Sequence, residues 1–565
     1  MTSTVRLWSV ACLVMLTSGE LLQNGGFESL DHWICWGAGM QCEVTTYKHG
    51  GSHAFKASGR TASWMGPSQN IQFVPGHSYR VSAWMKVFAD HPDQSVDIMV
   101  DITFTDGSHQ YEALVTHYNV KASDGYVHLF GVYTAPTKPI QNTRLYFQSA
   151  PVPIDFLVDD ASVTEETGGH VTIADLNHVI DQQRKSDIHV HVSTASVITE
   201  GDVKIRVLQK KKSFPFGTAV NAGRYNANLA GGKYRDFIHK HYNWAVPEGS
   251  LKWPFVEPQR GQQNYQPALD MIHRLRSHGI KVRGHNLVWS LPHFVQNWVK
   301  ALSGNELRTV VKHHIQQTMS KTRGLLEHWD VNNENLHGTW FQDRLHDPDY
   351  DLELFRIAHQ ADPNVKLFLN DFNVVASGAS TNDYLEQAQQ VKKAGVGLSA
   401  IGVQCHFGDE VEPDISAIKR RLDTLAGAGL PIWVTELDVM SADENRRADF
   451  YEHALRALYG HPAVEGILMW GFWDQSHWRG EKAALVKGDN LQMTAAGHRV
   501  LDLYENQWMT DETHTLPHSG NQVSVRGFHG DYEVHVIYQG TELSSLRQTF
   551  TLGKGPHSVS VHVQK

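Results

Sequence analysis

Two glutamates that share one local setting are the residues of this chain best suited to do chemistry. Glu334 ends the stretch HWDVNNE at 328–334, and Glu436 lies within PIWVTELDV at 431–439. The first is a short, apolar-flanked run and the second is apolar and β-rich, and both patterns predict strands. In a barrel of parallel strands, carboxylates at strand C-terminal ends lie where the loops build active sites. A pair of carboxyl groups can cleave a glycosidic bond, although either glutamate taken alone could be a solvated strand end.

The composition indicates a folded protein of several domains. The chain has 565 residues, 41% hydrophobic and 19% charged, so it is too long for one ordinary core and too apolar to be disordered. A net charge of −10 leaves no basic excess to neutralise phosphates, which argues against nucleic-acid and membrane partners. The 16 Trp and 18 Tyr residues are compatible with sugar binding, because aromatic faces stack on sugar C–H faces, although most Trp residues fill cores.

The N-terminus predicts export. Arg6 precedes the apolar run 7–16, and small residues follow as far as Gly19, so residues 1–19 are a predicted secretory signal peptide. No later stretch is apolar enough for long enough to span a membrane. We therefore expect a secreted, extracellular protein.

The cysteines agree with an oxidising compartment. Cys35 and Cys42 lie seven residues apart across the turn-like segment WGAGMQ, and we predict a disulfide between them. Cys405 lies in an apolar run and is expected to be a buried free thiol.

Changes in strand and helix pattern divide the remaining chain. Short alternating strands separated by turn residues predict a β-sandwich. Strands alternating with helical runs predict a barrel. The predicted domains are a β-sandwich at 20–166, a linker and small β appendage at 167–212, a barrel at 213–512 and a C-terminal β domain at 513–565.

The barrel is predicted from eight strand-like runs with helical segments such as 267–279 and 307–324 between them. A (β/α)₈ barrel is the expected fold, with a doubly wound open sheet as the alternative. No Gly-x-Gly-x-x-Gly turn or phosphate loop supports that alternative. The predicted strands are 214–220, 242–248, 281–289, 328–334, 366–373, 400–407, 431–439 and 466–474.

Most of these runs end in polar or aromatic residues, so their side chains should meet at one end of the barrel. This convergence favours a functional pair of glutamates over two solvated strand ends. The residues are Glu248, Lys252, His285, Trp289, Asn333, Glu334, Asn370, Asp371, Asn373, Gln404, His406, Glu436, Asp438, Trp470 and Trp478.

The same stretch resembles glycoside hydrolase family 10, the endo-β-1,4-xylanases, in its multidomain plant and animal form. The motifs that carry the resemblance occur in the family's order: RGHNLVW (283–289), WDVNNE (329–334), NDFN (370–373), GVQCHF (402–407), VTELDV (434–439) and WGFWD (470–474). The resemblance implies a retaining endo-β-1,4-glycanase that acts on xylan, without a cofactor or catalytic metal, and leaves activity on cellulose-like β-1,4-glucan open.

The resemblance also implies roles for the site residues. Glu334 is the general acid/base and Glu436 the nucleophile, with carboxyl groups about 5–5.5 Å apart as retention requires. Glu334 must then have a raised pKa, from burial and from the negative charge of Glu436. His406 is expected to bind Glu436, and Asn333 to contact the sugar 2-OH. The remaining substrate-binding residues implied are Glu248, Lys252, His285, Trp289, Gln404, Trp470 and Trp478.

Two positions depart from the family's bacterial members. Gly249 stands where many carry Asn, and Ser290 where they often carry His. Both lie on the glycone side, so a roomier pocket could accept the additional hydroxymethyl group of glucose.

The N-terminal segment resembles a carbohydrate-binding module that accompanies xylanases, through LLQNGGFES at 21–29 and GRTASWMGPSQNI at 59–71. The resemblance implies a sugar platform of Trp64, Tyr111 and Tyr146, with Gln148 as a polar contact where the family usually carries Glu. It also implies a structural calcium ion, for which Glu28 and Asp160 are the candidate ligands, although they supply fewer oxygens than calcium takes.

Two other functions remain open. The chain could be a glycan-binding protein without catalysis, or a transglycosylase that uses the same covalent intermediate and passes it to a sugar. The expected partner in each case is a polysaccharide, and we expect a monomer.

Overall fold

The computed structural model describes residues 19–91, 94–166, 171–195, 200–408, 411–517 and 521–564. The predicted signal peptide, apart from Gly19, therefore lies outside the described residues. Among the residues described, no helix combines the length and apolar character needed to cross a membrane. The chain forms two compact units, Met1–Gly169 and His170–Lys565.

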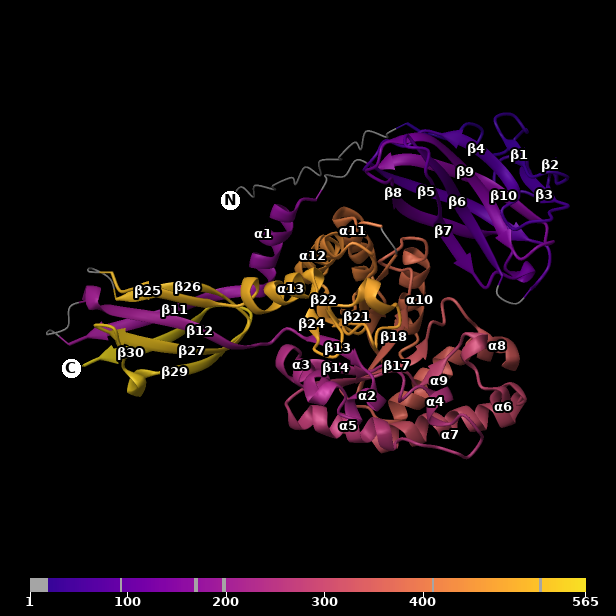
Figure 1. The fold of residues 1–565 in the computed structure, drawn as a ribbon. Helices are drawn as coiled ribbons and strands as arrows, with labels where there is room; N and C mark the ends of the chain where they lie inside the picture. The colour runs from indigo at the N-terminus through magenta and orange to yellow at the C-terminus, as the bar shows by residue number, and fades with distance from the viewer. Residues whose placement is uncertain are drawn as a thin grey trace, which may run out of the picture. The chain divides into compact units, whose positions relative to one another are not determined.

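The first unit is a sandwich of antiparallel sheets, as predicted (Figure 1). Residues on one side of each strand form its core; in β5, for example, Tyr79, Val81, Ala83, Met85 and Val87 are all buried. Over the described part of this unit, one sheet contains β1 (Ile34–Trp36), β4 (Gly66–Ile71), β9 (Ile140–Ala150), β6 (Ser95–Phe104) and β7 (His109–Tyr118). The other contains β2 (Gln41–Thr45), β3 (Ala54–Ser58), β10 (Phe156–Glu166), β5 (Ser78–Val87) and β8 (Val127–Thr134).

The second unit contains the predicted (β/α)₈ barrel. Within the described residues, eight parallel strands close into a ring, because β15 pairs with β17 at one side and β13 pairs with β22 at the other. The ring is β13 (Phe216–Val220), β14 (Trp244–Pro247), β15 (Lys281–Gly284), β17 (His328–Asn333), β18 (Lys366–Asp371), β19 (Leu398–Val403), β21 (Ile432–Val439) and β22 (Val464–Met469). The closed ring confirms the barrel and excludes the open sheet.

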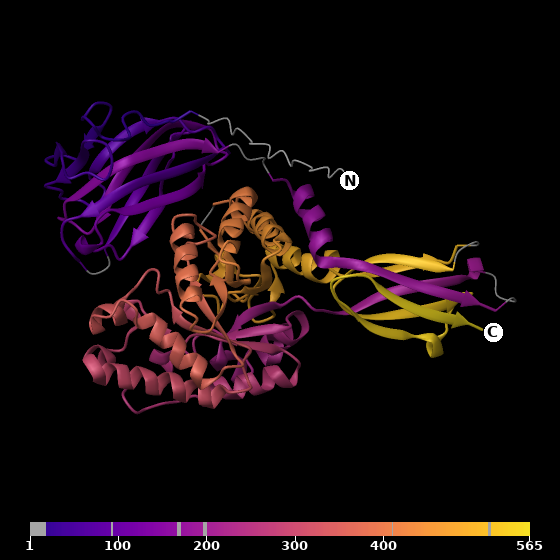
Figure 2. The ribbon, with the colours of Figure 1, turned by 180° about the vertical axis from the view of Figure 1, so that it is seen from behind.

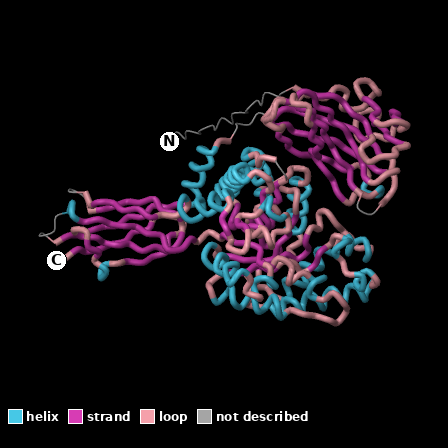
Figure 3. Tube along the Cα trace, in the orientation of Figure 1, coloured by secondary structure: helices cyan, strands magenta, loops and turns pink. Residues whose placement is uncertain are grey.

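Helices surround this ring, as Figure 2 shows from behind and Figure 3 by colour. Because the strands are covered on both faces, they read as apolar runs; all of β21 is buried. The longer helices are α3 (Lys233–His241), α5 (Gln266–Ser277), α7 (Gly304–Thr322), α9 (Tyr350–Ala361), α10 (Thr381–Lys393), α11 (Ile415–Ala426), α12 (Glu444–Gly460) and α13 (Ala495–Asp502).

Two predicted strands are interrupted at the site end of the barrel. The run 281–289 forms β15 and then the short β16 (Val288–Trp289), which pairs with β17. Similarly, Gln404 and Cys405 separate β19 from β20 (His406–Phe407). The interior of the ring is packed with apolar side chains, including Trp244, Phe368, Trp433 and Leu468, so it is a core and not a pore.

The two β segments that we predicted as separate, at 167–212 and 513–565, form one sandwich, which corrects that expectation. After helix α1 (Ile173–Arg184), β11 (Lys185–Thr194) lies between β26 (Gln522–Phe528) and β30 (His557–Val563). In the second sheet, β12 (Val203–Lys212) lies between β25 (Asp511–Thr515) and β27 (Gly530–Tyr538). Two strands cannot bury their own apolar face, and the C-terminal strands cover it with residues such as Val523 and Val534.

Candidate active site

Both predicted glutamates lie at the C-terminal ends of barrel strands. Glu334 follows the last residue of β17 and has a backbone φ of 58°, an unusual conformation for a residue with a side chain. Glu436 lies within β21, which is separated from β17 in the ring by β18 and β19. Their side chains are 8% and 4% exposed. Positive φ values of non-glycine residues cluster at functional sites, where surrounding contacts hold them.

Glu334 is held by two hydrogen-bond donors. The amide Nε2 of Gln404 donates to Oε1 at 2.9 Å, and the indole Nε1 of Trp289 donates to Oε2 at 2.6 Å. Burial raises the pKa of Glu334 to about 7, and the negative charge of Glu436 adds to this, although the Gln404 hydrogen bond acts the other way. Glu334 can therefore carry a proton near neutral pH.

Glu436 has the opposite electrostatic environment. Burial alone would raise its pKa, but the hydrogen bond from His406 and the positive charges of His285, His406 and Lys252 outweigh burial and lower the pKa to about 2. The His406 Nε2 atom lies 3.3 Å from Oε2, and Asn370 Nδ2 donates to Oε1 at 2.9 Å. Glu436 is therefore a carboxylate at any pH where the protein would work.

The imidazole of His406 is fixed by Asp438. His406 Nδ1 lies 2.9 Å from Asp438 Oδ2, which also accepts a hydrogen bond of 2.7 Å from Trp478 Nε1. Burial lowers the pKa of His406, but the charge of Asp438 and hydrogen bonds to Asp438 and Glu436 dominate and raise it to about 9. A protonated His406 can donate to both carboxylates at once.

Asn333 presents an amide to the space beside the glutamates. Its Oδ1 accepts a hydrogen bond of 2.9 Å from Asn370 Nδ2, and the same nitrogen reaches Glu436. Asn333 is completely buried, and its Nδ2 has no partner within the described part of the chain. A buried donor without a partner is costly, so Asn333 Nδ2 can donate to a ligand that enters the site.

The other predicted binding residues extend the same surface. The Lys252 ammonium lies 4.5 Å from the ring centre of Trp289 and 5.6 Å from that of Trp470. The ring of His285 meets Trp470 edge to face at 5.2 Å, and Asn221 Nδ2 donates to Glu248 Oε2 at 3.0 Å. Trp478 is exposed and contacts the His406 ring.

Sequence reasoning gave no role to several residues that hold this arrangement together. Asp438 orients His406, and Asn370 bridges Asn333 to Glu436. Asp330 accepts from Arg283 and lies 2.8 Å from His285 Nδ1. A signal for Asp438 existed, because residues two apart on a strand share a face and Asp438 follows Glu436 at that spacing.

The two positions that depart from the bacterial pattern, Gly249 and Ser290, differ in how closely their neighbours pack around them. A Cβ atom at Gly249 would lie 3.8 Å from the ring of Phe255, an ordinary contact, so nothing crowds this position. Ser290 is buried and donates a hydrogen bond of 2.5 Å to Asn332 Oδ1.

In the N-terminal unit, two of the three aromatic residues predicted to stack on sugar are exposed and the third, Tyr146, is buried. Tyr111 is 64% exposed and Trp64 41% exposed, and Gln148 donates to Asp97 at 3.2 Å. Tyr146, however, is only 3% exposed, because the ring of Trp36 packs against it. The expected role of Tyr146 as a stacking surface stays a prediction, and in this structure Trp36 covers its ring.

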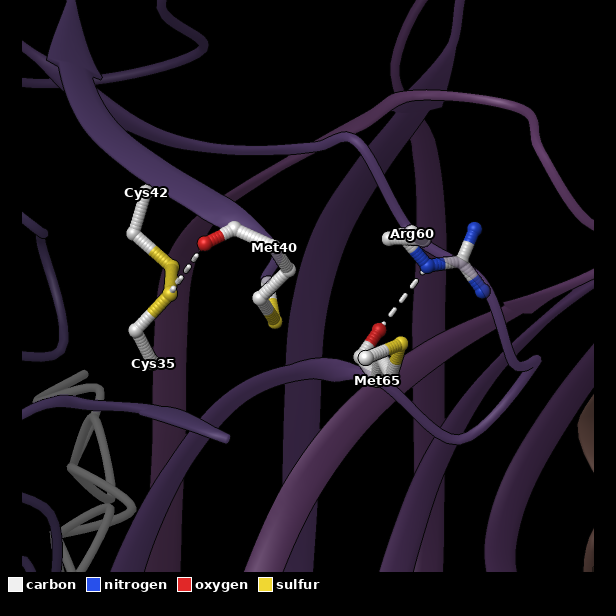
Figure 4. Close-up of a disulfide and its surroundings, with 5 residues drawn as sticks. All are labelled: Cys35, Met40, Cys42, Arg60 and Met65. Atoms are coloured by element: carbon white, nitrogen blue, oxygen red, sulfur yellow. Dashed lines mark hydrogen bonds between the residues drawn. A yellow bond between two sulfur atoms is a disulfide. The ribbon is translucent and has the colours of Figure 1, made fainter. Parts of the chain in front are cut away.

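The predicted disulfide between Cys35 and Cys42 is confirmed (Figure 4). Cys405 is free and buried, as predicted.

The predicted calcium ligands both approach the loop at 49–53. Glu28 Oε2 lies 3.1 Å from His53 Nδ1, and Asp160 Oδ2 lies 2.8 Å from His49 Nδ1. Calcium takes six to eight oxygen ligands, whereas here an imidazole occupies one oxygen of each carboxylate. No group of three or more His, Cys, Asp or Glu residues that could hold a metal ion occurs among the described residues. As arranged here, these residues do not fit calcium.

Comparison with known proteins adds independent findings. The model of "Glycosyl hydrolase family 10" matches residues 205–503, and that of a "Carbohydrate binding domain" matches residues 19–153. Endo-1,4-beta-xylanase 1 of Arabidopsis thaliana is 31% identical over 512 residues, which are 89% of this chain and 52% of that protein. Endo-1,4-beta-xylanase 3 of the same plant is 32% identical over 520 residues, which are 89% of this chain and 66% of that protein.

This chain thus spans about half to two thirds of the length of those curated relatives. Among solved structures, xylanase 10B from Thermotoga petrophila RKU-1, in complex with xylobiose, is 22% identical with a TM-score of 0.48, covering 60% of this chain and 99% of its own.

Proposed function

The chain belongs to glycosyl hydrolase family 10, and from that premise we propose that it is a retaining endo-β-1,4-glycanase that hydrolyses xylan. The observation that supports the proposal best is the opposite electrostatic environment of Glu334 and Glu436, both at the C-terminal ends of barrel strands. One carboxyl group has a pKa near 7 and the other near 2. Hydrolysis with retention needs one protonated and one ionised carboxyl group.

The first step forms a glycosyl-enzyme. A carboxylate oxygen of Glu436 attacks the anomeric carbon while the glycosidic C–O bond breaks, and Glu334 transfers its proton to the departing sugar oxygen. The charge of Glu436 is then lost in the new ester bond. Without that negative neighbour the pKa of Glu334 falls, and the group can act as a base.

The second step releases the sugar. Glu334 takes a proton from a water molecule, the water oxygen bonds to the anomeric carbon, and Glu436 leaves as a carboxylate. The protonation states of both groups return to their starting condition. His406 stabilises the departing carboxylate through its Nε2–H, and Asn333 Nδ2 is available to donate to the sugar 2-OH.

The test is reducing-sugar release from soluble xylan by the purified chain. We expect release by the unaltered chain and its loss in Glu334→Gln and Glu436→Gln, each of which keeps the side-chain volume. Proton NMR of the first products should show the β anomer, the product of retention. A chain that binds xylan but releases no sugar would be a binding protein, and longer products than the substrate would indicate a transglycosylase.

A second substrate is favoured by the space at Gly249. No side chain occupies this point beside Glu248, so the glycone side can accept a larger sugar. We propose that β-1,4-glucan is a weaker substrate than xylan. Rates measured on xylan and on carboxymethylcellulose test this: Gly249→Asn should lower the glucan rate more than the xylan rate.

We also propose that the chain is secreted as a monomer and that its N-terminal unit binds the polysaccharide. The Cys35–Cys42 disulfide supports an oxidising compartment. N-terminal sequencing of protein recovered from the medium should begin near residue 20, and light scattering should give the mass of one chain.

A further inference from the structure

Trp36 lies on the same sheet face as the predicted sugar-binding residues. In the register of β1, β4 and β9, Ile34 pairs with Ser68, and Ser68 pairs with Tyr146. Alternate residues of a strand share a face, so Trp36, two residues after Ile34, is on the face of Tyr146. Tyr111 pairs with Asp101, which pairs with Arg144, and Arg144 is two residues before Tyr146.

The ring of Trp36 is the centre of an aromatic group on that face. Its centroid lies 4.9 Å from that of Trp64 and 4.8 Å from that of Tyr146, and the Arg144 guanidinium lies 4.8 Å from it. Trp36 is half-buried, whereas Tyr146 beneath it is buried. A sugar that approaches this surface therefore meets Trp36 and Trp64 before it can reach Tyr146.

A disulfide and a set of hydrogen bonds hold the backbone on either side of Trp36 and Trp64. Cys35 precedes Trp36, and its disulfide to Cys42 joins β1 to β2, the neighbouring edge of the other sheet. Arg60, buried beneath the loop that carries Trp64, donates to the carbonyl oxygens of Met65 at 2.8 Å and Ile154 at 2.7 Å (Figure 4 shows the first). The backbone that carries the rings of Trp36 and Trp64 is therefore held in place.

We propose that Trp36 is a sugar-stacking residue of the N-terminal unit, in the place expected for Tyr146, and that the Cys35–Cys42 disulfide is its positioning element. The ligand is a β-1,4-linked pyranoside chain, whose C–H faces pack on indole rings. This inference rests on the proposed polysaccharide binding of the unit. The disulfide can act through Trp36 because β1 has three residues and, among the described residues, one strand partner, so the Cys35 bond holds the residue next to Trp36.

The experiment measures retardation of the full chain in gels that contain soluble xylan. Every variant carries Glu436→Gln, so that the polymer is not degraded, and the Trp36→Ala Trp64→Ala Tyr111→Ala triple variant defines retardation by the barrel alone. We expect Trp36→Ala to weaken the part above this baseline about tenfold and Trp36→Phe to recover part of it. Tyr47→Ala, which removes an exposed ring elsewhere on the unit, should leave retardation unchanged.

The role of the disulfide is tested by a double-mutant cycle. Cys35→Ser Cys42→Ser should weaken retardation in the chain with Trp36, and should have no further effect in Trp36→Ala. Calorimetry checks that each variant is folded; if Trp36→Ala is not, Trp36→Phe and Trp36→Leu replace it.

Each outcome decides a different statement. If the unaltered chain does not exceed the barrel baseline, both the proposed polysaccharide binding of the unit and this inference fail. If it does, but Trp36→Ala is retarded as strongly as the unaltered chain, only the inference fails. Additive losses in the cycle would show that the disulfide does not act through Trp36.

Discussion

Replacing Gln404 by Met should move the alkaline limb of the pH–rate profile. Gln404 Nε2 donates to Glu334 Oε1 at 2.9 Å, and this hydrogen bond is the strongest influence that lowers the pKa of Glu334. Methionine has a similar length and is apolar, so it can fill the buried position without donating. Removing a donor that favours the ionised carboxylate raises the pKa of Glu334. The acid then stays protonated to higher pH.

The size of the shift follows from the hydrogen bond. A hydrogen bond to a charged group contributes about 1.5–3 kcal/mol, and one pKa unit corresponds to about 1.4 kcal/mol, which gives about 1–2 units. Because Glu334 is almost fully buried, solvent screening reduces this pKa shift only slightly. The pKa of Glu334 should therefore rise from about 7 to about 8–9.

The assay is kcat/KM for an aryl β-xylobioside from pH 4 to pH 10, because the pH dependence of kcat/KM reports groups of the free enzyme. The alkaline limb should move up even if the maximum rate falls, and kcat/KM should stay level toward pH 4, because the pKa of Glu436 is about 2. Trp289→Phe, which removes the other donor to Glu334, should move the same limb in the same direction. An alkaline limb that stays fixed or moves down would refute the assignment of Glu334 as the acid.

Three further predictions concern other contacts. His406→Phe removes the hydrogen bond and charge that lower the pKa of Glu436, so that pKa should rise by about 1–2 units and kcat/KM, measured down to pH 3, should fall below about pH 4; a kcat/KM that stays level to pH 3 would contradict this. Asn333→Ala should lower kcat about 10²–10³-fold with little change in KM, as expected for a donor to the transition state, whereas an effect confined to KM would mean ground-state binding. Arg60→Met leaves buried carbonyl oxygens such as that of Met65 without their donor, so calorimetry should show the unfolding of the N-terminal unit destabilised by about 2 kcal/mol or more, with the barrel transition unchanged.

Helical and strand periodicity located the barrel because each of its strands is buried on both faces. Such strands read as continuous apolar runs, and the run around Glu436 coincides with β21 to within a residue at its start. The interruption between β15 and β16 was not predicted: the run 281–289 was interpreted as one strand, although the polar residues His285 and Asn286 stand where the chain leaves the ring. Strand pairing decides where such a run stops being a strand.

The sequence by itself determined the two glutamates, the barrel that presents them and the cysteines that join in a disulfide, because these depend on residue type, order and local pattern. Tertiary structure alone decided which segments pair when they are distant in the chain: β11 and β12 are completed by strands more than 300 residues later. It also decided that Trp36 covers Tyr146, since burial of a ring depends on its neighbours in space. Local pattern fixes what a segment can be, and packing fixes what it faces.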